Sequence, residues 1–123
     1  MDQRYRIAIE EFGRAIGVPA RFNARNESAF EFSTSGKLTF TPDVGQEGLV
    51  MSMTRNMIAT PSQQRDALAM AGYDESMRLT LMSGLNERNN IVLAIPMKGD
   101  QITGQRLLEG FEFLKRKQKT VLV

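Results

Sequence analysis

The sequence predicts an α+β fold, a twisted antiparallel sheet of about five strands with three helices in the order α-β-β-β-α-β-β-α. Apolar residues recur at helical spacing near both ends of the chain, which indicates amphipathic helices there. Between them, apolar and polar residues alternate in short segments separated by Gly, Pro, Asn and Asp, which indicates strands and turns. The 123 residues contain no internal repeat or linker, so we expect a single domain spanning residues 1–123.

The first helix is expected over residues 3–16. Asp2 is positioned to cap its N-terminus. Gly17 and Pro19 end it, because glycine accepts a left-handed cap and proline cannot continue a helix. One face carries apolar residues at spacings of four, three and four: Tyr5, Ile9, Phe12 and Ile16.

Three segments with a period of two follow, around residues 30–32, 38–40 and 49–53. A short turn at 35–37 joins the first two, and a longer loop at 42–48 leads to the third. Such spacing predicts an antiparallel meander. A short leading strand over residues 20–25 is an alternative to a loop there.

A second helix begins at Thr60, the predicted N-cap. Pro61 suits the first helical position, and Gln63 completes a capping box with Thr60. We expect the helix to run to about Ala71 and to end at Gly72. Its apolar residues are small or flexible, so it should pack closely on another surface, for example on its own copy: Ala67, Leu68, Met70 and Ala71.

A second hairpin is expected from strands at 77–81 and 91–97, with a loop at 83–89. The latter strand is apolar on both faces, which is typical of a well buried strand. Pro96 has no N–H to donate, so its end of that strand should lie at an edge.

The last helix is expected over about residues 101–117, with Asp100 as its cap. Its core stripe is Leu107, Phe111 and Leu114, with Leu108 beside it. Residues 121–123 are apolar, and both a frayed tail and pairing with a sheet edge fit them. A basic cluster lies near the helix end, where cations suit the helix dipole: Lys115, Arg116, Lys117 and Lys119.

The basic cluster leaves two interpretations open. It is either a solvated helix end or a contact for nucleic acid or an acidic partner. The net charge is only +2, from 16 basic and 14 acidic residues, and no aromatic residue is interleaved with the lysines. Both features weaken the nucleic-acid reading, since single strands are usually bound by stacking on aromatic side chains. A small nucleic-acid-binding module is therefore the alternative function, and we expect no nucleic-acid partner.

Histidine and cysteine are absent, which removes the commonest general base, the commonest metal ligand and all thiolate chemistry. Carboxylates remain, but the pairs Glu10–Glu11 and Glu109–Glu112 have helix-surface spacing, and nothing in the pattern desolvates them. A carboxylate and metal enzyme is thus only a third hypothesis. We expect no catalytic residue, no metal and no cofactor.

No apolar run approaches the roughly 18 residues of a membrane span. The N-terminal segment MDQRYRIAIEEFG is too charged for the apolar core of a signal peptide. We therefore expect a cytoplasmic protein with no membrane insertion.

Several motifs in order resemble one family. FGRAIGVP at residues 12–19 looks like an "LG.ALGLP" opening, and FEF at 30–32 with LTF at 38–40 looks like an "ALEF…LTVTL" hairpin. The strand at 91–97 followed by LLEGFEFL at 107–114 looks like an "LVL.LPL…LLEALEAFL" ending. Together they resemble the class I chaperones of bacterial type III secretion, the Tir-chaperone-like family.

The resemblance implies a bacterial virulence protein of the cytoplasm that acts in protein transport. Such chaperones are homodimers that bind the N-terminal segment of a secreted effector in extended form and keep it soluble and export-competent without ATP. The secretion ATPase is a further expected partner. By the resemblance, the second helix and the following strand form the dimer interface: Leu68, Met70, Ala71, Met77, Leu79 and Leu81.

A protein that binds extended peptides needs exposed apolar pockets and a free sheet edge. Eight methionines suit a surface that adapts to its partner. The competing interpretation is that each apolar position is simply core. The expected effector-binding surface is Ile9, Phe12, Phe30, Phe32, Phe40, Met51 and Met53.

Overall fold

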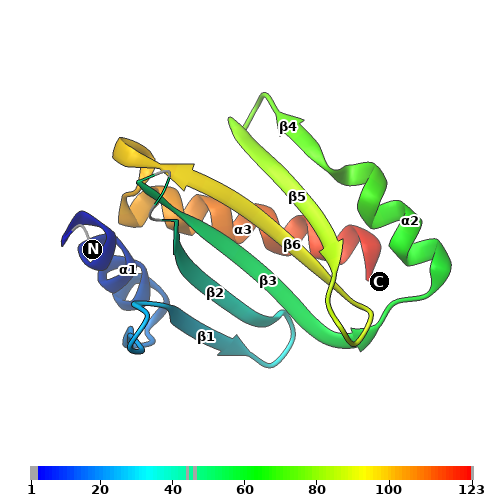
Figure 1. Cartoon of the computed structure of the whole chain (residues 1–123), viewed down its shortest axis with the longest axis horizontal. Coiled ribbons are helices and arrows are strands. Elements are labelled where there is room, and N and C mark those ends of the chain that lie inside the picture. Colours follow the sequence, from blue (N-terminus) through cyan, green and yellow to red (C-terminus); the bar gives the residue numbers. More distant parts are fainter. Residues whose placement is uncertain (1–2, 44, 46, 123) are drawn as a thin grey trace.

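The structure is a computed structural model that describes residues 3–43, 45 and 47–122. Asp2 and Val123, both named in the sequence predictions, lie outside the described residues. The elements, drawn in Figure 1, are α1 (Gln3–Ile16), β1 (Ser28–Phe32), β2 (Gly36–Asp43), β3 (Gly48–Ile58), α2 (Pro61–Met70), β4 (Gly72–Asp74), β5 (Leu79–Leu85), β6 (Asn90–Lys98), the 3-10 turn η2 (Gly99–Gln101) and α3 (Gly104–Val121).

The strands form one antiparallel sheet in the order β1-β2-β3-β6-β5-β4. Helices α1 and α3 pack against each other behind this sheet, whereas α2 packs against β5 at one side (Figure 1). The α+β class and the element order are confirmed. The described chain has six strands rather than about five, because the short β4 pairs with the first half of β5.

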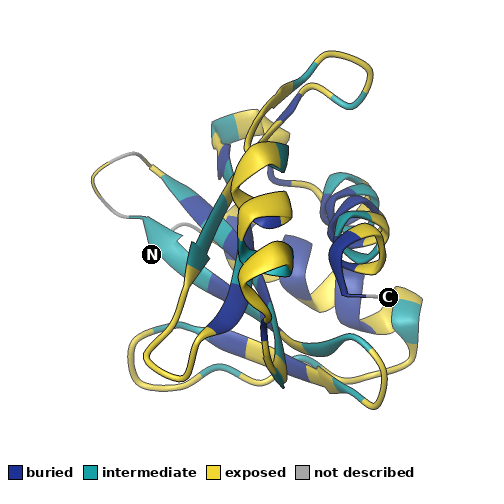
Figure 2. Cartoon of the chain, turned by 90° about the vertical axis from the view of Figure 1, so that its right-hand side faces the viewer, coloured by how far each residue is buried: buried dark blue, intermediate teal, exposed yellow. Residues whose placement is uncertain are grey.

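The core lies between the sheet and the pair α1 and α3. Apolar residues of α1 face the buried side of β1, β2 and β3, and Leu107, Phe111 and Leu114 of α3 are buried among them. Gly110 lets α3 come close to the sheet, since a Cβ there would lie 2.9 Å from the Met51 sulfur. Figure 2 shows the contrast with α2, which is mainly exposed and buries only Ala67.

The helix signals that depend on neighbouring residues are confirmed. Gly17 has a φ of 77° and follows the last residue of α1. Thr60 and Gln63 form the predicted capping box, with Pro61 at the start of α2. Residues 20–25 form no strand, because only the bridge between Phe22 and Ser28 joins this segment to the sheet.

Two boundaries of the second hairpin were predicted wrongly. Met77 lies in a turn, and β5 begins at Leu79 and runs to Leu85, through residues expected to be loop. The prediction for Pro96 is confirmed, because Pro96 pairs with β3 whereas the β5–β6 ladder reaches only Ala94. The proline therefore faces no strand on the β5 side.

The cap and the end of the last helix were also predicted wrongly. Thr103, not Asp100, caps α3, and its hydroxyl accepts the N–H of Arg106. The helix continues to Val121, so of the basic cluster only Lys119 lies in the last turn. Val121 and Leu122 are buried, so these two residues are neither a frayed tail nor a strand.

Candidate functional site

Most of the expected effector-binding residues lie inside the core. Phe12 is at its centre, with its ring edge-to-face against Phe30, Phe40 and Phe111 at centroid distances of 5.3, 5.2 and 5.5 Å. Only Phe32 keeps part of its surface open, stacked on Phe111 at 4.9 Å. The expectation of an exposed surface is therefore corrected for the six residues that are buried: Ile9, Phe12, Phe30, Phe40, Met51 and Met53.

The reason is geometric. The apolar stripe of α1 and the apolar alternation of β1, β2 and β3 point to the same side of the sheet, and they cover each other. Periodicity shows which side chains share a face but not which face stays open. The predicted residues thus share one side of the sheet, but that side is buried rather than exposed.

Three exposed large apolar side chains lie where α2, β4 and β5 are side by side, whereas others, among them Ile7 and Ile58, lie on different elements. Tyr73 stands opposite Thr80 in the β4–β5 ladder, so Tyr73 and Met82 share one face of that ladder. We call this set the α2–β5 surface, with the exposed fraction of each residue: Leu68 60%, Tyr73 62% and Met82 42%. Leu85 is also exposed, but it lies three residues beyond Met82 and faces the other side of β5.

The expected dimer residues divide between this surface and the core. Leu68 and Ala71 are exposed, and Met70 and Met77 are partly buried against the core. Leu79 and Leu81 are buried within their own chain. The sequence analysis missed Tyr73, because a three-residue strand after Gly72 shows no alternation, and its dimer set did not include Met82.

The turn between β4 and β5 is tied to α3. The Arg106 guanidinium donates to the carbonyl oxygens of Met77 and Arg78, the latter at 3.0 Å, and pairs with Glu109 at 3.1 Å. Arg78 has a φ of 55°, so the turn holds a backbone conformation that side chains disfavour. The guanidinium therefore fixes a turn that connects two strands of the α2–β5 surface.

Asp74 braces the same turn. The Met77 N–H and the Ser76 hydroxyl both donate to Asp74 Oδ1, at 2.9 and 2.7 Å. These hydrogen bonds, the Met77 N–H first, hold the pKa of Asp74 below its usual value. The carboxylate is therefore favoured in its charged form in the folded turn.

A second tie joins α3 to the β1–β2 turn. Gln118 is buried, and its Nε2 donates to the Ser35 carbonyl at 2.9 Å across 83 residues of sequence. Strand β1 is an outer strand of the sheet, with β2 as its only neighbouring strand in the sheet order. The turn at one end of this edge strand is thus set by a side chain of α3.

The basic cluster has partners within the chain. Lys115 lies 4.5 Å from the Phe111 ring centroid and 3.0 Å from Glu112, and Lys117 lies 5.4 Å from the Phe113 ring. These contacts favour the interpretation of the cluster as part of the helix end, and the nucleic-acid alternative gains no support. Among residues 3–43, 45 and 47–122, no acidic cluster suitable for a metal ion occurs, and no helix is long and apolar enough to cross a membrane.

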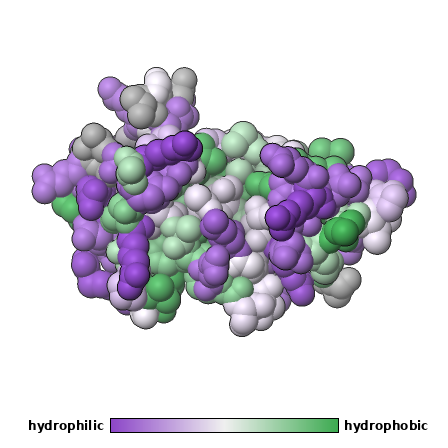
Figure 3. Space-filling model, turned by 60° about the horizontal axis from the view of Figure 1, so that its bottom comes forward, coloured by the Kyte–Doolittle hydropathy of each residue, from purple (hydrophilic) through white to green (hydrophobic). Residues whose placement is uncertain are grey.

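Hydrophilic side chains break up the apolar surface on the face that Figure 3 presents. Pale and green surface alternates with purple side chains over this face, in its middle as well as toward both ends.

Comparison with known proteins finds likeness in structure. No protein-family model matches the sequence, and no curated protein does. The structure of the Yersinia pestis type III secretion chaperone SycH, in complex with a stable fragment of YscM2, is similar with a TM-score of 0.76 at 19% identity, over 95% of this chain and 98% of that one.

Two further complexes show the same arrangement. The HopA1–SchA chaperone–effector complex matches with a TM-score of 0.71 at 15% identity, over 96% of this chain and 92% of that one. The ExoT–SpcS complex from Pseudomonas aeruginosa matches with a TM-score of 0.66 at 12% identity, over 98% and 99%. The chain therefore has the fold of the class I type III secretion chaperones.

Proposed function

We propose that this chain is a type III secretion chaperone that binds the N-terminal segment of a secreted effector in extended form. It acts without ATP in the bacterial cytoplasm and keeps the segment soluble and export-competent, with the secretion ATPase as a further partner. One observation carries the proposal, the match over 95% of this chain to a chaperone that was solved with a bound partner fragment.

The α2–β5 surface supports a homodimer. Apolar side chains that gather at one end of a small domain cost free energy in water unless another surface covers them. A second copy would cover Leu68, Tyr73 and Met82, and each square ångström of apolar surface removed from water contributes about 25 cal/mol. The proposed interface keeps the second helix and the following strand, but it uses their exposed residues rather than Leu79 and Leu81.

The effector contact is proposed for the region around β1. Beyond Ser28, whose outer side is bridged to Phe22, the outer edge of β1 is available for an added strand, which is how many proteins bind extended peptides. Phe32 offers a partly open aromatic face beside that edge. The buried apolar residues would act by holding β1 and α1 in place.

Co-expression tests the proposal. The chain is produced together with the N-terminal segment of a secreted protein encoded next to it. The molar mass of the complex is then measured by light scattering coupled to size-exclusion chromatography. We expect two chains, each of 13.8 kDa, per effector segment. A chain that stays monomeric at all concentrations and never co-purifies with such a segment would refute it.

Variants at exposed positions test dimerisation without disturbing the folding of each chain. Leu68→Asp and Tyr73→Asp place a charge on exposed positions, so we expect folded monomers. Ile7→Asp is the matched control, because Ile7 is 46% exposed but lies on α1. If the dimer dissociation constant is the same in all three variants, the interface lies elsewhere.

A further inference from the structure

The outer edge of β1 has a short stretch of backbone that is open to a partner. Strand β1 has a neighbour on one side only, so alternate residues along it direct their N–H and C=O groups away from β2. The Asn23 N–H donates to the Glu27 carbonyl at 3.0 Å from outside the sheet, so Glu27 is one of the outward residues. By alternation, Ala29 and Glu31 are the outward residues within β1.

The loop before β1 closes the start of this edge. The Glu27 N–H donates to the Asn23 side-chain oxygen at 2.9 Å, and the bridge between Phe22 and Ser28 extends the contact to the first residue of β1. Among the described residues, none donates to or accepts from the outward groups of Glu31. A strand added to the open part of this edge is therefore centred on Glu31.

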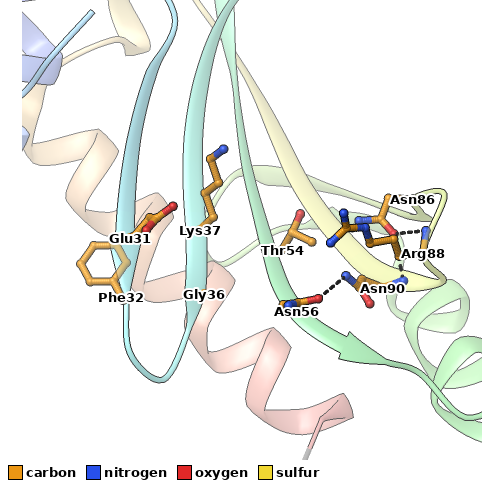
Figure 4. Close-up of a pocket in the computed structure, with 9 residues that line it drawn as sticks. All are labelled: Glu31, Phe32, Gly36, Lys37, Thr54, Asn56, Asn86, Arg88 and Asn90. Carbon is orange, nitrogen blue, oxygen red and sulfur yellow. Dashed lines mark hydrogen bonds between the residues drawn. The ribbon is translucent and has the colours of Figure 1, made fainter.

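Glu31 also presents an exposed carboxylate there. Its side chain points away from α1 and α3, because its neighbours Phe30 and Phe32 are directed toward the core. Lys37 stands directly opposite it on β2, and Figure 4 shows both side chains on neighbouring strands. Within the described chain the two do not form an ion pair. The carboxylate is thus able to pair with a charge on a partner.

We propose that the edge of β1 selects a segment that carries Lys or Arg opposite Glu31, between two apolar residues. This inference rests on the proposed function and names the chemistry of the bound segment. The Cβ atoms of directly opposed residues lie about 5 Å apart, so a cation there is attracted to the Glu31 carboxylate. Lys37 would lie two strand spacings away, about 10 Å, where salt screens the repulsion. An acidic residue would face Glu31 directly, which is unfavourable.

The two neighbours of that cation point the other way, toward the side of α1 and α3. On that side Phe32 is partly open and stacks on Phe111 at 4.9 Å. Phe22, which stands opposite Ser28, is partly buried at the other end of the open stretch. Apolar side chains fit beside both rings. The pattern apolar–basic–apolar is the same in both directions, so it holds for parallel and antiparallel addition.

An NMR titration of the ¹⁵N-labelled full chain tests this selection. The probes are three capped peptides, acetyl-Thr-Val-Xaa-Val-Thr-amide, with Lys, Gln or Glu as Xaa. Peptides of this size bind with a Kd on the order of millimolar. We expect a saturable shift of the Glu31 backbone amide. The Lys peptide should bind about two- to fivefold tighter than the Gln peptide, and the Glu peptide should bind weaker than the Gln peptide by a similar factor.

Charge variants give a second readout. In Glu31→Lys the order of the three peptides should reverse, and in Glu31→Gln the Lys and Glu peptides should bind equally. Glu10→Lys is the matched control, because Glu10 is exposed on α1 and the substitution adds the same net charge. It should keep the wild-type order. Glu31→Gln decides the matter if a second cation opposite Lys37 loosens the hairpin.

The same order of peptides in the wild type and in Glu31→Gln would overturn the proposed selection. A saturable shift that leaves out the Glu31 amide, or no saturable shift with any of the three peptides, would overturn the site itself. Co-purification with an effector is measured separately. An effector complex that forms without the charge preference refutes the selection alone, whereas a chain that never co-purifies refutes the proposed function.

Discussion

Replacing Phe12 with leucine removes three aromatic contacts while keeping an apolar side chain at the centre of the core. Phe12 is fully buried, and its edge-to-face pairs with Phe30, Phe40 and Phe111 each contribute about 0.5–1.5 kcal/mol beyond burial. Leucine also fills the space less well. We therefore expect Phe12→Leu to lower the free energy of unfolding by about 2–4 kcal/mol.

Equilibrium urea unfolding measures this loss. With a slope of about 1–3 kcal/mol per M for a small domain, the midpoint should fall by about 1–2 M at unchanged slope. All samples are compared at one protein concentration, because dimerisation would add to the apparent stability. The control is Phe22→Leu, since Phe22 is only partly buried and its ring contact is with the Arg6 guanidinium at 4.3 Å.

We expect the control to lose less than about 1 kcal/mol. If Phe12→Leu is no less stable than Phe22→Leu, the aromatic cluster is not the centre of the core. If Phe12→Leu keeps full stability but loses its effector, the original interpretation of Phe12 as a binding residue is correct.

Three further changes test the ties to α3 and the acid sensitivity of the β4–β5 turn. Arg106→Ala should cost about 1–3 kcal/mol in urea unfolding, because the Met77 and Arg78 carbonyls lose their charged donor; a loss no larger than that of Lys119→Ala, an exposed helix control, would contradict it. Gln118→Ala should cost about 1–2 kcal/mol and speed hydrogen exchange in the β1–β2 turn, and unaltered exchange there would count against the tie. Because the pKa of Asp74 is lowered in the folded state, its carboxylate stabilises the fold above pH 3.8, the usual value, and this stabilisation is lost as pH falls through the lower, folded-state pKa. The Met77 amide signal should therefore titrate below pH 3.8 in the wild type and should not titrate in Asp74→Asn. A midpoint at or above 3.8 would refute that account.

Local signals made the helices and caps predictable from the sequence. The capping box at Thr60 and the glycine stop at Gly17 depend on residues within one turn, and both are present as expected. Asp100 and Thr103 are both plausible caps three residues apart, and packing decides between them. Gly104 lies against α1, where a Cβ would be 2.7 Å from the Glu11 Cβ, so α3 begins where the two helices meet.

Features that depend on partners distant in sequence were missed. Strand β4 is three residues long, and pairing with β5 rather than its own pattern makes it a strand. The α2–β5 surface was found only at Leu68, because Tyr73 and Met82 become neighbours through that same pairing.

The two ties from α3 have a consequence for the order in which the protein forms during synthesis. Strand β3 pairs with β6, so the middle of the sheet cannot close until residues 90–98 have left the ribosome. The side chains that fix both outer turns, Arg106 and Gln118, are made later still. Contacts between such distant parts of a chain form slowly. Until α3 docks, the nascent chain therefore exposes an apolar sheet face and two loose hairpins, and in that interval it needs protection from aggregation.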